Sequence, residues 1–282
     1  MWNVDLGDVD AVIERALAED LAGGDITTMA TVPPDLKVDA RLVAKAPLVV
    51  CGLFVAGRVL TKLDPSLRFT AKVSEGNRVT AGEVLAVMEG NARAMLAGER
   101  TALNLMQRLS GVATLTRSFV DAAGGSARIC DTRKTTPGLR RLQRYAVRCG
   151  GGHNHRNDLG SGVLVKENHI RCAGGVEAAV RAARRRAPHP LRIECEVTDF
   201  AELDAAIEAG ADAVLLDNMD DERVRAAVAR VGRRAIVEIS GGVTLERVPK
   251  LAAAGVDIIS VGALTHSAPA ADISMLFGQK PK

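Results

Sequence analysis

Aromatic side chains are scarce in this sequence of 282 residues, in which Phe, Trp and Tyr together make up 2%. Proteins that hold single-stranded nucleic acid stack bases on aromatic rings beside a basic groove. Here the 37 Lys and Arg residues nearly balance the 34 Asp and Glu residues, and the net charge is +3. The composition therefore argues against nucleic acid as a partner and leaves room for a small charged substrate.

The sequence has no C-x-x-C pair, and its cysteines are odd in number. They are Cys51, Cys130, Cys149, Cys172 and Cys195. This usage is typical of reduced thiols in the cytoplasm, where free cysteines mostly act as small buried hydrophobic residues.

Targeting and membrane signals are missing as well. The first residues, MWNVDLGDVD, carry no positive charge, so we expect no signal peptide. An apolar stretch over residues 42–60 is long enough to suggest a membrane span, but Lys45, Pro47, Arg58 and two glycines interrupt it. These interruptions favour a core strand followed by a helix. We therefore expect a cytoplasmic protein without membrane contact.

A G-x-G-x-x-G fingerprint for dinucleotide binding is also absent. Instead, short apolar strands alternate with amphipathic helices, and the last four strands are centred on Ile193, Val214, Ile236 and Ile258. Two similar units, ARICDTRK and GVLVKEN with their helices, precede them. Such alternation predicts a parallel sheet. Six units over about 150 residues favour an α/β barrel over an open sheet.

The first hundred residues follow another pattern. DVDAVIERALAEDL is typical of a helix, and DARLVAKAPLVV and LRFTAKV are typical of strands. EGNRVTAGEVLAVMEG has the turn spacing of lipoyl and biotinyl carriers but lacks their hairpin-tip lysine, so we expect a structural β layer. A long helix over residues 99–123 should join the two parts.

Charged and polar residues follow every predicted barrel strand. In α/β barrels the active site lies at the carboxyl ends of the strands, so these side chains would meet at one mouth. Taken singly, each is more often a salt-bridged residue of the rim, but together they favour a site. The full inventory at the strand ends, including small and apolar residues of the turns, is Asp131, Thr132, Arg133, Lys134, Lys166, Glu167, Asn168, Glu194, Glu196, Asp217, Asn218, Ser240, Gly241, Gly242, Gly262, Ala263, Leu264 and Thr265.

Glycines in SGG and VGAL follow the last two predicted strands. Barrels often bind phosphate there, because glycine lets backbone N–H groups approach the anion and a helix N-terminus adds a positive dipole. An ordinary βα turn would also use glycine, so SGG alone does not decide between the two.

The loop RCGGGHNHRNDLGSG contains His153, His155 and Arg156. The two histidines are possible metal ligands, but no third histidine or cysteine stands at zinc spacing. A loop in which His155 and Arg156 bind anionic oxygens fits better, since arginine suits bidentate binding of carboxylate and phosphate.

The candidate site thus combines a basic set with two acids. The basic residues are Arg133, Lys134, His155, Arg156 and Lys166. They call for a ligand with several negative groups, whereas Glu196 and Asp217 suit a sugar diol, a Mg²⁺ ion or a developing positive charge. A phosphorylated sugar that reacts with a polycarboxylate satisfies both requirements.

The chain resembles quinolinate phosphoribosyltransferase, also called nicotinate-nucleotide pyrophosphorylase (carboxylating), a type II phosphoribosyltransferase. The motifs that carry this resemblance are DTRKTTPGLR, NHRNDLG, VLVKENHI, ECEV, LLDN, ISGGV and VGALTHSAPA. GGDITT and GERTALN extend it into the N-terminal part. Each motif alone is weak, but seven in the right order are specific.

The resemblance implies an N-terminal α/β sandwich domain over residues 1–110, an incomplete α/β barrel of about six to seven parallel strands over 111–275, and a tail over 276–282. It implies that quinolinate and phosphoribosyl pyrophosphate react, with Mg²⁺, to nicotinate mononucleotide, pyrophosphate and CO₂. It also implies a homodimer or an assembly of dimers.

The same resemblance assigns roles to residues. Lys134, Lys166, Glu196 and Asp217 fall on catalytic positions, and the two acids lie near the ribose and Mg²⁺. Arg100 falls on an arginine that reaches the partner subunit's site. The substrate-binding positions are Arg100, Thr132, Arg133, Lys134, Thr135, His155, Arg156, Lys166, Glu196 and Asp217, with Ser240, Gly241, Gly242, Gly262, Ala263 and Leu264 at the 5′-phosphate.

Two alternatives remain open at this point. A paralogue that acts on nicotinate or another acid would not release CO₂ from quinolinate. A non-catalytic barrel that binds phosphosugars would bind without turnover. The complete basic set and both acids favour the enzyme.

Overall fold

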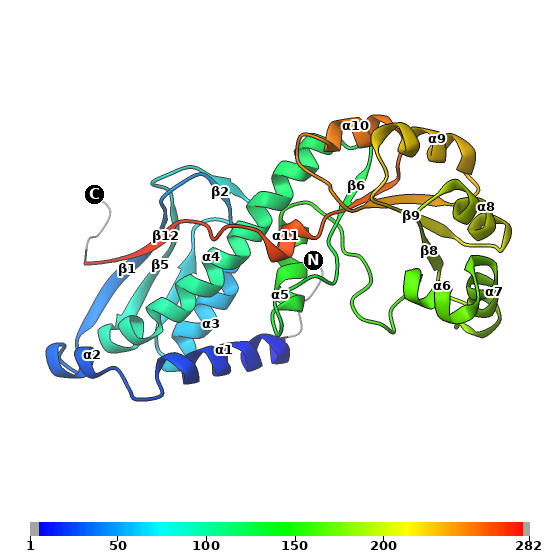
Figure 1. Cartoon of the computed structure of the whole chain (residues 1–282). Coiled ribbons are helices and arrows are strands. Elements are labelled where there is room, and N and C mark those ends of the chain that lie inside the picture. Colours follow the sequence, from blue (N-terminus) through cyan, green and yellow to red (C-terminus); the bar gives the residue numbers. More distant parts are fainter. Residues whose placement is uncertain (1–5, 279–282) are drawn as a thin grey trace. The chain divides into compact units, whose positions relative to one another are not determined.

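The computed structural model describes residues 6–278, which form two compact units (Figure 1). Unit 1 contains residues up to 117, 135–151 and those from 264 on, and unit 2 contains residues 118–134 and 152–263. The predicted domain boundary near residue 110 stays a prediction. The predicted tail over 276–282 does too, and its residues 279–282 lie outside the described residues, as do residues 1–5 of the N-terminal segment.

Unit 1 is built on an antiparallel sheet of order β12-β1-β5-β3, beside a small sheet that pairs β2 with β4. Its strands are β1 (Lys37–Ala44), β2 (Leu48–Val49), β3 (Arg68–Ala71), β4 (Arg78–Val79), β5 (Val84–Asn91) and β12 (Ile273–Phe277). The predicted β layer is therefore present. Strand β12, near the end of the chain, lies along β1, with Leu42 opposite Met275 (Figure 1).

The helices of unit 1 bury apolar faces that the sequence spacing predicts. They are α1 (Leu6–Asp20), α2 (Ile26–Thr31), α3 (Leu53–Leu63), α4 (Ala92–Ala123, of which the last six residues belong to unit 2), α5 (Arg140–Cys149) and α11 (Ala263–His266, of which the first residue belongs to unit 2). Val9, Ile13 and Leu17 of α1 are buried at i, i+4 spacing. Helix α4 begins before the predicted residue 99, because the Asn91 side chain at the end of β5 accepts a hydrogen bond from the Ala94 N–H.

Unit 2 contains a parallel six-stranded sheet of order β6-β11-β10-β9-β8-β7. The strands are β6 (Arg128–Cys130), β7 (Val163–Val165), β8 (Ile193–Val197), β9 (Ala213–Asp217), β10 (Ile236–Ser240) and β11 (Ile258–Ser260). All six predicted strands are present. A parallel bridge between Cys130 and His153 adds one further pairing at the open edge of β6.

Helices connect these strands, as the alternating pattern predicts (Figure 1). They are α6 (Glu167–Ala173), α7 (Val176–Arg186), α8 (Phe200–Glu208), α9 (Asp221–Val231) and α10 (Val248–Ala253). Gly232 ends α9 in the left-handed conformation, with φ +54°, where glycine lacks the Cβ that other residues must accommodate. Among residues 6–278, no helix combines the length and apolar character needed to cross a membrane.

Candidate active site

The register of the parallel sheet brings polar residues of unit 2 to one face. Glu196 of β8 and Glu238 of β10 both pair with Leu215 of β9, and Asp217 pairs with Ser240 one layer further toward the carboxyl ends. Side chains in register share a face of the sheet. The strand ends of β8, β9 and β10 therefore present carboxylates and a hydroxyl on the same side.

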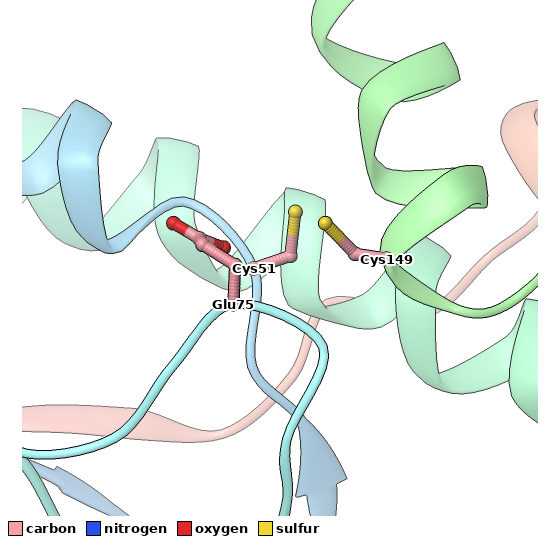
Figure 2. Close-up of side chains that lie close together, drawn as sticks. All are labelled: Cys51, Glu75 and Cys149. Carbon is pink, nitrogen blue, oxygen red and sulfur yellow. The ribbon is translucent and has the colours of Figure 1, made fainter. Parts of the chain in front are cut away.

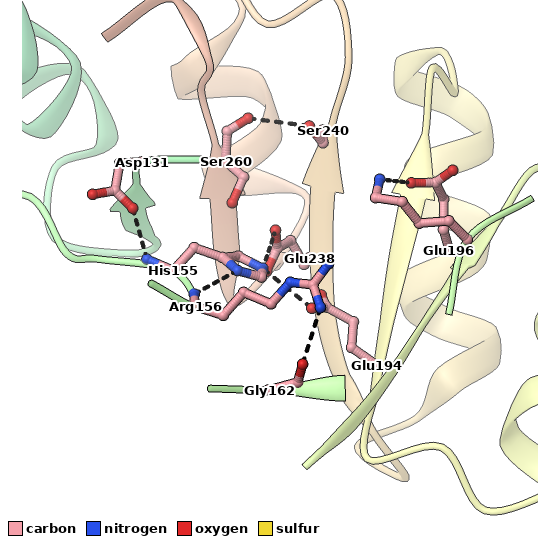
Figure 3. Close-up of polar contacts among 10 residues, drawn as sticks. Asp131, His155, Arg156, Gly162, Glu194, Glu196, Glu238, Ser240 and Ser260 are labelled. Carbon is pink, nitrogen blue, oxygen red and sulfur yellow. Dashed lines mark hydrogen bonds and ion pairs between the residues drawn. The ribbon is translucent and has the colours of Figure 1, made fainter. Parts of the chain in front are cut away.

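Lys166 follows β7 directly and reaches across to the next strand. Its Nζ forms an ion pair with Oε2 of Glu196 (Figure 3). Glu196 is mostly buried, whereas the Lys166 side chain is 46% exposed, so the pair stands where the sheet meets solvent. The structure thus brings together two of the residues that the sequence singled out.

His155 lies among buried carboxyl groups of the same unit. Its Nε2 is 3.2 Å from Oε2 of Glu194 and 3.5 Å from Oε1 of Glu238 (Figure 3). Its Nδ1 accepts a hydrogen bond of 2.7 Å from the Arg156 N–H. In its neutral form the ring therefore carries its proton on Nε2, where it donates to Glu194.

Asp131, at the end of β6, places this histidine. The carboxylate accepts a 2.8 Å hydrogen bond from the His155 N–H (Figure 3). It also accepts a 2.5 Å hydrogen bond from Nδ2 of Asn154. The backbone of His153 also pairs with β6, through bonds to Ile129 and Asp131. The segment that carries His155 is thus held along the edge strand of the sheet.

Burial and mutual repulsion keep one of these carboxyl groups neutral. Burial, and then the charge of Glu194, raise the pKa of Glu238 to about 8. Burial works to lower the pKa of His155, but its hydrogen bond to Glu194 and the charges of Glu238, Glu194 and Asp131 outweigh burial and raise that pKa. At neutral pH we expect a protonated Glu238 beside a His155–Glu194 pair.

Two guanidinium groups lie near one another in the same unit. Burial, and then the positive charge of Arg133, lower the pKa of Arg156. One guanidinium nitrogen of Arg156 donates a 3.0 Å hydrogen bond to the Gly162 carbonyl, which fixes its direction (Figure 3). Two like charges held close together in partly buried positions favour an anion beside them.

A shallow hollow of about 650 Å³ lies beyond the ends of β9 and β10, lined in part by Asn218, Gly241, Gly242 and Arg247. Gly241 has φ +84°, and a Cβ there would lie 2.2 Å from Oδ1 of Asn218. This close approach requires glycine. The hollow contains two of the residues predicted to bind phosphate.

The remaining predicted residues have simpler surroundings. The Thr132 hydroxyl accepts a hydrogen bond from the N–H of the exposed Lys134, and the Ser240 hydroxyl donates to the Ser260 carbonyl over 3.5 Å. Gly262 and Ala263 follow β11 in unit 2. Three predicted residues belong to unit 1: Arg100, which is exposed on α4; Thr135, whose hydroxyl accepts from Arg140; and Leu264, which is buried.

Sequence reasoning missed Glu238, and it noted Glu194 without giving it a role. A signal was present, because both acids interrupt apolar strands, in IVEIS and IECEV. A carboxyl group buried inside a strand needs a partner. Here that partner is His155, which lies far away in the sequence.

Two family models match nearly the whole chain. Residues 25–110 match the model described as the N-terminal domain of quinolinate phosphoribosyl transferase, and residues 112–276 match its C-terminal domain. The chain belongs to the quinolinate phosphoribosyltransferase family. The resemblance seen in the motifs and the predicted fold class are both confirmed.

This member of the quinolinate phosphoribosyltransferase family has relatives to which it is similar over more than nine tenths of their length. The chain is 45% identical over 270 residues to a nicotinate-nucleotide pyrophosphorylase (carboxylating) of Mycobacterium leprae, covering 93% of this chain and 95% of that protein. It is 42% identical over 265 residues to a probable enzyme of the same name from Bacillus subtilis, covering 94% and 91%. The solved nicotinate-nucleotide pyrophosphorylase of Francisella tularensis superposes with a TM-score of 0.94 at 39% identity, covering 98% of each chain.

Proposed function

We propose that this chain transfers the phosphoribosyl group of phosphoribosyl pyrophosphate to the ring nitrogen of quinolinate and releases CO₂. The products are nicotinate mononucleotide, a precursor in NAD biosynthesis, and pyrophosphate. The names of its full-length relatives support this reaction. The observation that carries it is the gathering of Lys166, Glu196 and Asp217 at the strand ends of the unit that also contains Arg133 and Arg156.

Quinolinate carries two carboxylates, which suit two neighbouring guanidinium groups. Each of Arg133 and Arg156 offers a planar fork that matches a carboxylate. Arg156 is held by the Gly162 carbonyl, so it binds with little loss of side-chain freedom. Holding both acids fixes the direction of the ring nitrogen, and this positioning removes much of the entropic barrier to attack.

The ring nitrogen has a lone pair at neutral pH, so no general base is needed for the attack. The anomeric carbon becomes positively charged as pyrophosphate departs, and the carboxylates of Glu196 and Asp217 would stabilise that charge. The bond to the ribose leaves the ring nitrogen positive. That positive charge stabilises the electron pair left on the adjacent ring carbon when its carboxylate leaves as CO₂, and a proton from solvent then takes the place of the carboxylate on that carbon.

Lys166 acts on Glu196 and on the substrate from the same position. The ion pair fixes the direction of the Glu196 carboxylate across the strand ends. Because Lys166 is half exposed, its ammonium group can turn toward an arriving anion. Lys134, exposed after β6, supplies a further positive charge.

The donor set fits Mg²⁺, which prefers carboxylate oxygens and keeps places for substrate phosphates and water. Glu196 and Asp217 stand on neighbouring strands, and each uses one oxygen, toward Lys166 and Asn218 respectively. These two carboxylates would hold the ion. Bound Mg²⁺ would neutralise charge on the departing pyrophosphate.

The proposal includes a homodimer, or an assembly of dimers, in which Arg100 reaches the partner's site. Arg100 is exposed on α4, where a second subunit has access to it. We also propose a cytoplasmic location, which agrees with five cysteines that are free thiols.

The test is a reaction mixture of protein, quinolinate, phosphoribosyl pyrophosphate and Mg²⁺, followed by chromatography for nicotinate mononucleotide. We expect one CO₂ per nucleotide, and little product when nicotinate replaces quinolinate. The variant R133A should lose turnover while its circular dichroism spectrum is unchanged. Turnover of nicotinate without CO₂ release, or unchanged activity of R133A, would overturn the proposal.

A further inference from the structure

Two cysteines and a glutamate, none of them assigned to the reaction, meet inside unit 1. The sulfur atoms of Cys51 and Cys149 and a carboxylate oxygen of Glu75 all lie within 4.8 Å of one another. The two cysteine side chains point toward each other from different segments (Figure 2). Cys51 is fully buried before α3, and Cys149 is half-buried at the end of α5.

The backbone holds both cysteines in place. Ser110 of α4 bonds Cys51 twice, accepting from its N–H at 3.0 Å and donating to its carbonyl at 2.9 Å. Gly76 lies so close to Cys149 that a Cβ would stand 3.1 Å from the Cys149 carbonyl oxygen. The fold therefore holds the two thiols next to each other.

The surroundings shift the pKa values of the two thiols in opposite directions. Hydrogen bonding from Cys51 lowers the pKa of Cys149, with further help from the Tyr145 hydroxyl and the charge of Arg148, against an opposing effect of burial. Burial, and then the interaction with Cys149, raise the pKa of Cys51. Cys149 thus favours the thiolate, which is the reactive form, and Cys51 stays a thiol beside it.

A metal ion fits this cluster poorly, because Glu75 already has partners. One carboxylate oxygen accepts a 2.8 Å hydrogen bond from the Gly52 N–H, and the other accepts from Phe54 at the start of α3. The glutamate therefore caps the helix, and only two sulfur ligands remain. A structural zinc site takes four.

We propose that Cys51 and Cys149 form a reversible disulfide when the protein meets a peroxide. This inference goes beyond the transferase reaction and does not depend on it. The two sulfurs are close enough that a small movement of either side chain brings them to bonding distance. Cys149 reacts first, since it is the more exposed and the more acidic thiol.

Disulfide formation takes two steps. The Cys149 thiolate attacks hydrogen peroxide, the O–O bond breaks, and hydroxide leaves and takes up a proton, which gives a sulfenic acid and water. The Cys51 sulfur then attacks the sulfenic sulfur, displacing hydroxide, which leaves as water with the Cys51 proton. In sum, two thiols and one peroxide give one disulfide and two waters.

The experiment uses the full chain carrying C172S, since Cys172 is exposed and would form bonds between molecules. The protein is treated with hydrogen peroxide near pH 7 and then denatured, its remaining thiols are alkylated, and its peptides are identified by mass spectrometry. We expect loss of two thiols, a linked Cys51–Cys149 peptide, and full recovery after dithiothreitol. Cys130 and Cys195 serve as internal controls that stay alkylatable, since burial raises the pKa of Cys195 to about 12 and that of Cys130 still further.

Three variants distinguish the thiol that reacts with peroxide, Cys149, from the thiol that completes the disulfide, Cys51. Circular dichroism and thermal unfolding confirm that each variant folds. C51S should turn Cys149 into a sulfinic acid, because no neighbouring thiol traps the sulfenic acid. C149S should leave Cys51 unreacted. Y145F should slow thiol loss about tenfold, since removing one hydrogen bond to the thiolate raises the pKa of Cys149.

Two results would overturn the inference. One is oxidation of Cys149 to sulfinic acid in the C172S protein while Cys51 stays free. The other is stoichiometric zinc in the purified protein, released by a mercurial reagent that titrates two thiols. An expected companion result is a melting temperature about 5 °C or more higher after oxidation, because the bond closes a loop of roughly 100 residues.

Discussion

Lys166 forms an ion pair with Glu196 at a position where both can act on a charged substrate. Replacing it in K166A leaves Glu196 without this ion pair and removes the charge-assisted contact to substrate that we propose for Lys166. Such a contact contributes about 1.5–3 kcal/mol, so kcat/KM should fall roughly 10- to 150-fold or more. Steady-state kinetics with quinolinate measures the loss.

A matched control for K166A lies on the adjacent helix. Arg171 is exposed and pairs with Glu167 at i, i+4 spacing on α6. R171A removes a cation from the same region, and we expect unchanged kinetics within about twofold. Equal losses in K166A and R171A would show that Lys166 acts only through the net charge of the surface.

Glu238 makes the stability of unit 2 depend on pH. Its folded-state pKa of about 8 lies above its ordinary value of 4.5, because it is buried beside Glu194 and His155. A carboxyl group with a raised pKa stabilises the fold fully below the unfolded pKa and loses that contribution as pH rises toward 8. The raised pKa of His155 acts in the same direction. The melting temperature should therefore fall between about pH 5 and pH 9.

The variant E238Q tests this assignment, since glutamine keeps the shape of the neutral acid and cannot ionise. We expect E238Q to match the parent protein at low pH and to exceed it in melting temperature above pH 8. Thermal unfolding across that range measures the difference. Parallel curves for the two proteins would contradict a protonated Glu238.

Helix α4 depends on one glycine at its crossing with the segment before β12. A Cβ at Gly111 would lie 1.9 Å from the Pro269 carbonyl oxygen, which is backbone and cannot rotate away. G111A should therefore cost about 1–3 kcal/mol or more in the free energy of unfolding. Urea denaturation measures it.

Gly98 on the same helix provides the control for G111A. A Cβ there would meet Leu60 and Leu63 at 2.9 and 3.0 Å, but these contacts are the ends of flexible side chains. Alanine also gains about 1 kcal/mol of helix propensity over glycine. G98A should unfold close to the parent protein, and a similar large loss in both variants would mean that α4 tolerates no alanine for a general reason.

At the scale of the element, sequence pattern predicted the six parallel strands well. Each strand is a short apolar run followed by an amphipathic helix, and that pattern depends only on neighbouring residues. The start of α4 was missed by several residues because its cap, Asn91, ends a strand without an intervening loop. Boundaries of this kind depend on one side-chain hydrogen bond.

At the scale of the whole molecule, the proposed dimer makes one clear prediction for Arg100. If Arg100 acts in the partner's site, a mixed dimer of R100A and K166A contains one site with both native residues. Random mixing should then restore about a quarter of the parent activity, well above the small residual activity of either variant alone. Activity is assayed after the subunits are denatured and refolded together.

The matching control mixes R100A with inactive E196A, which should recover to the same extent. Mixing K166A with E196A should restore nothing, because both residues belong to unit 2 of the same chain and no mixed site is intact. Absence of recovery in every mixture, with dimers present by sedimentation, would place Arg100 in its own chain's site.

The sequence by itself determined the family, the alternation of strands and helices, and the basic and acidic residues at the strand ends. These features follow from local periodicity and from motifs a few residues long. Only the tertiary structure decided that β12 pairs with β1, that Glu194 and Glu238 enclose His155, and that Cys51 faces Cys149. Each of these contacts joins segments that are far apart in the chain. Which distant segments meet depends on how the whole unit packs, and no single short stretch of sequence carries that information.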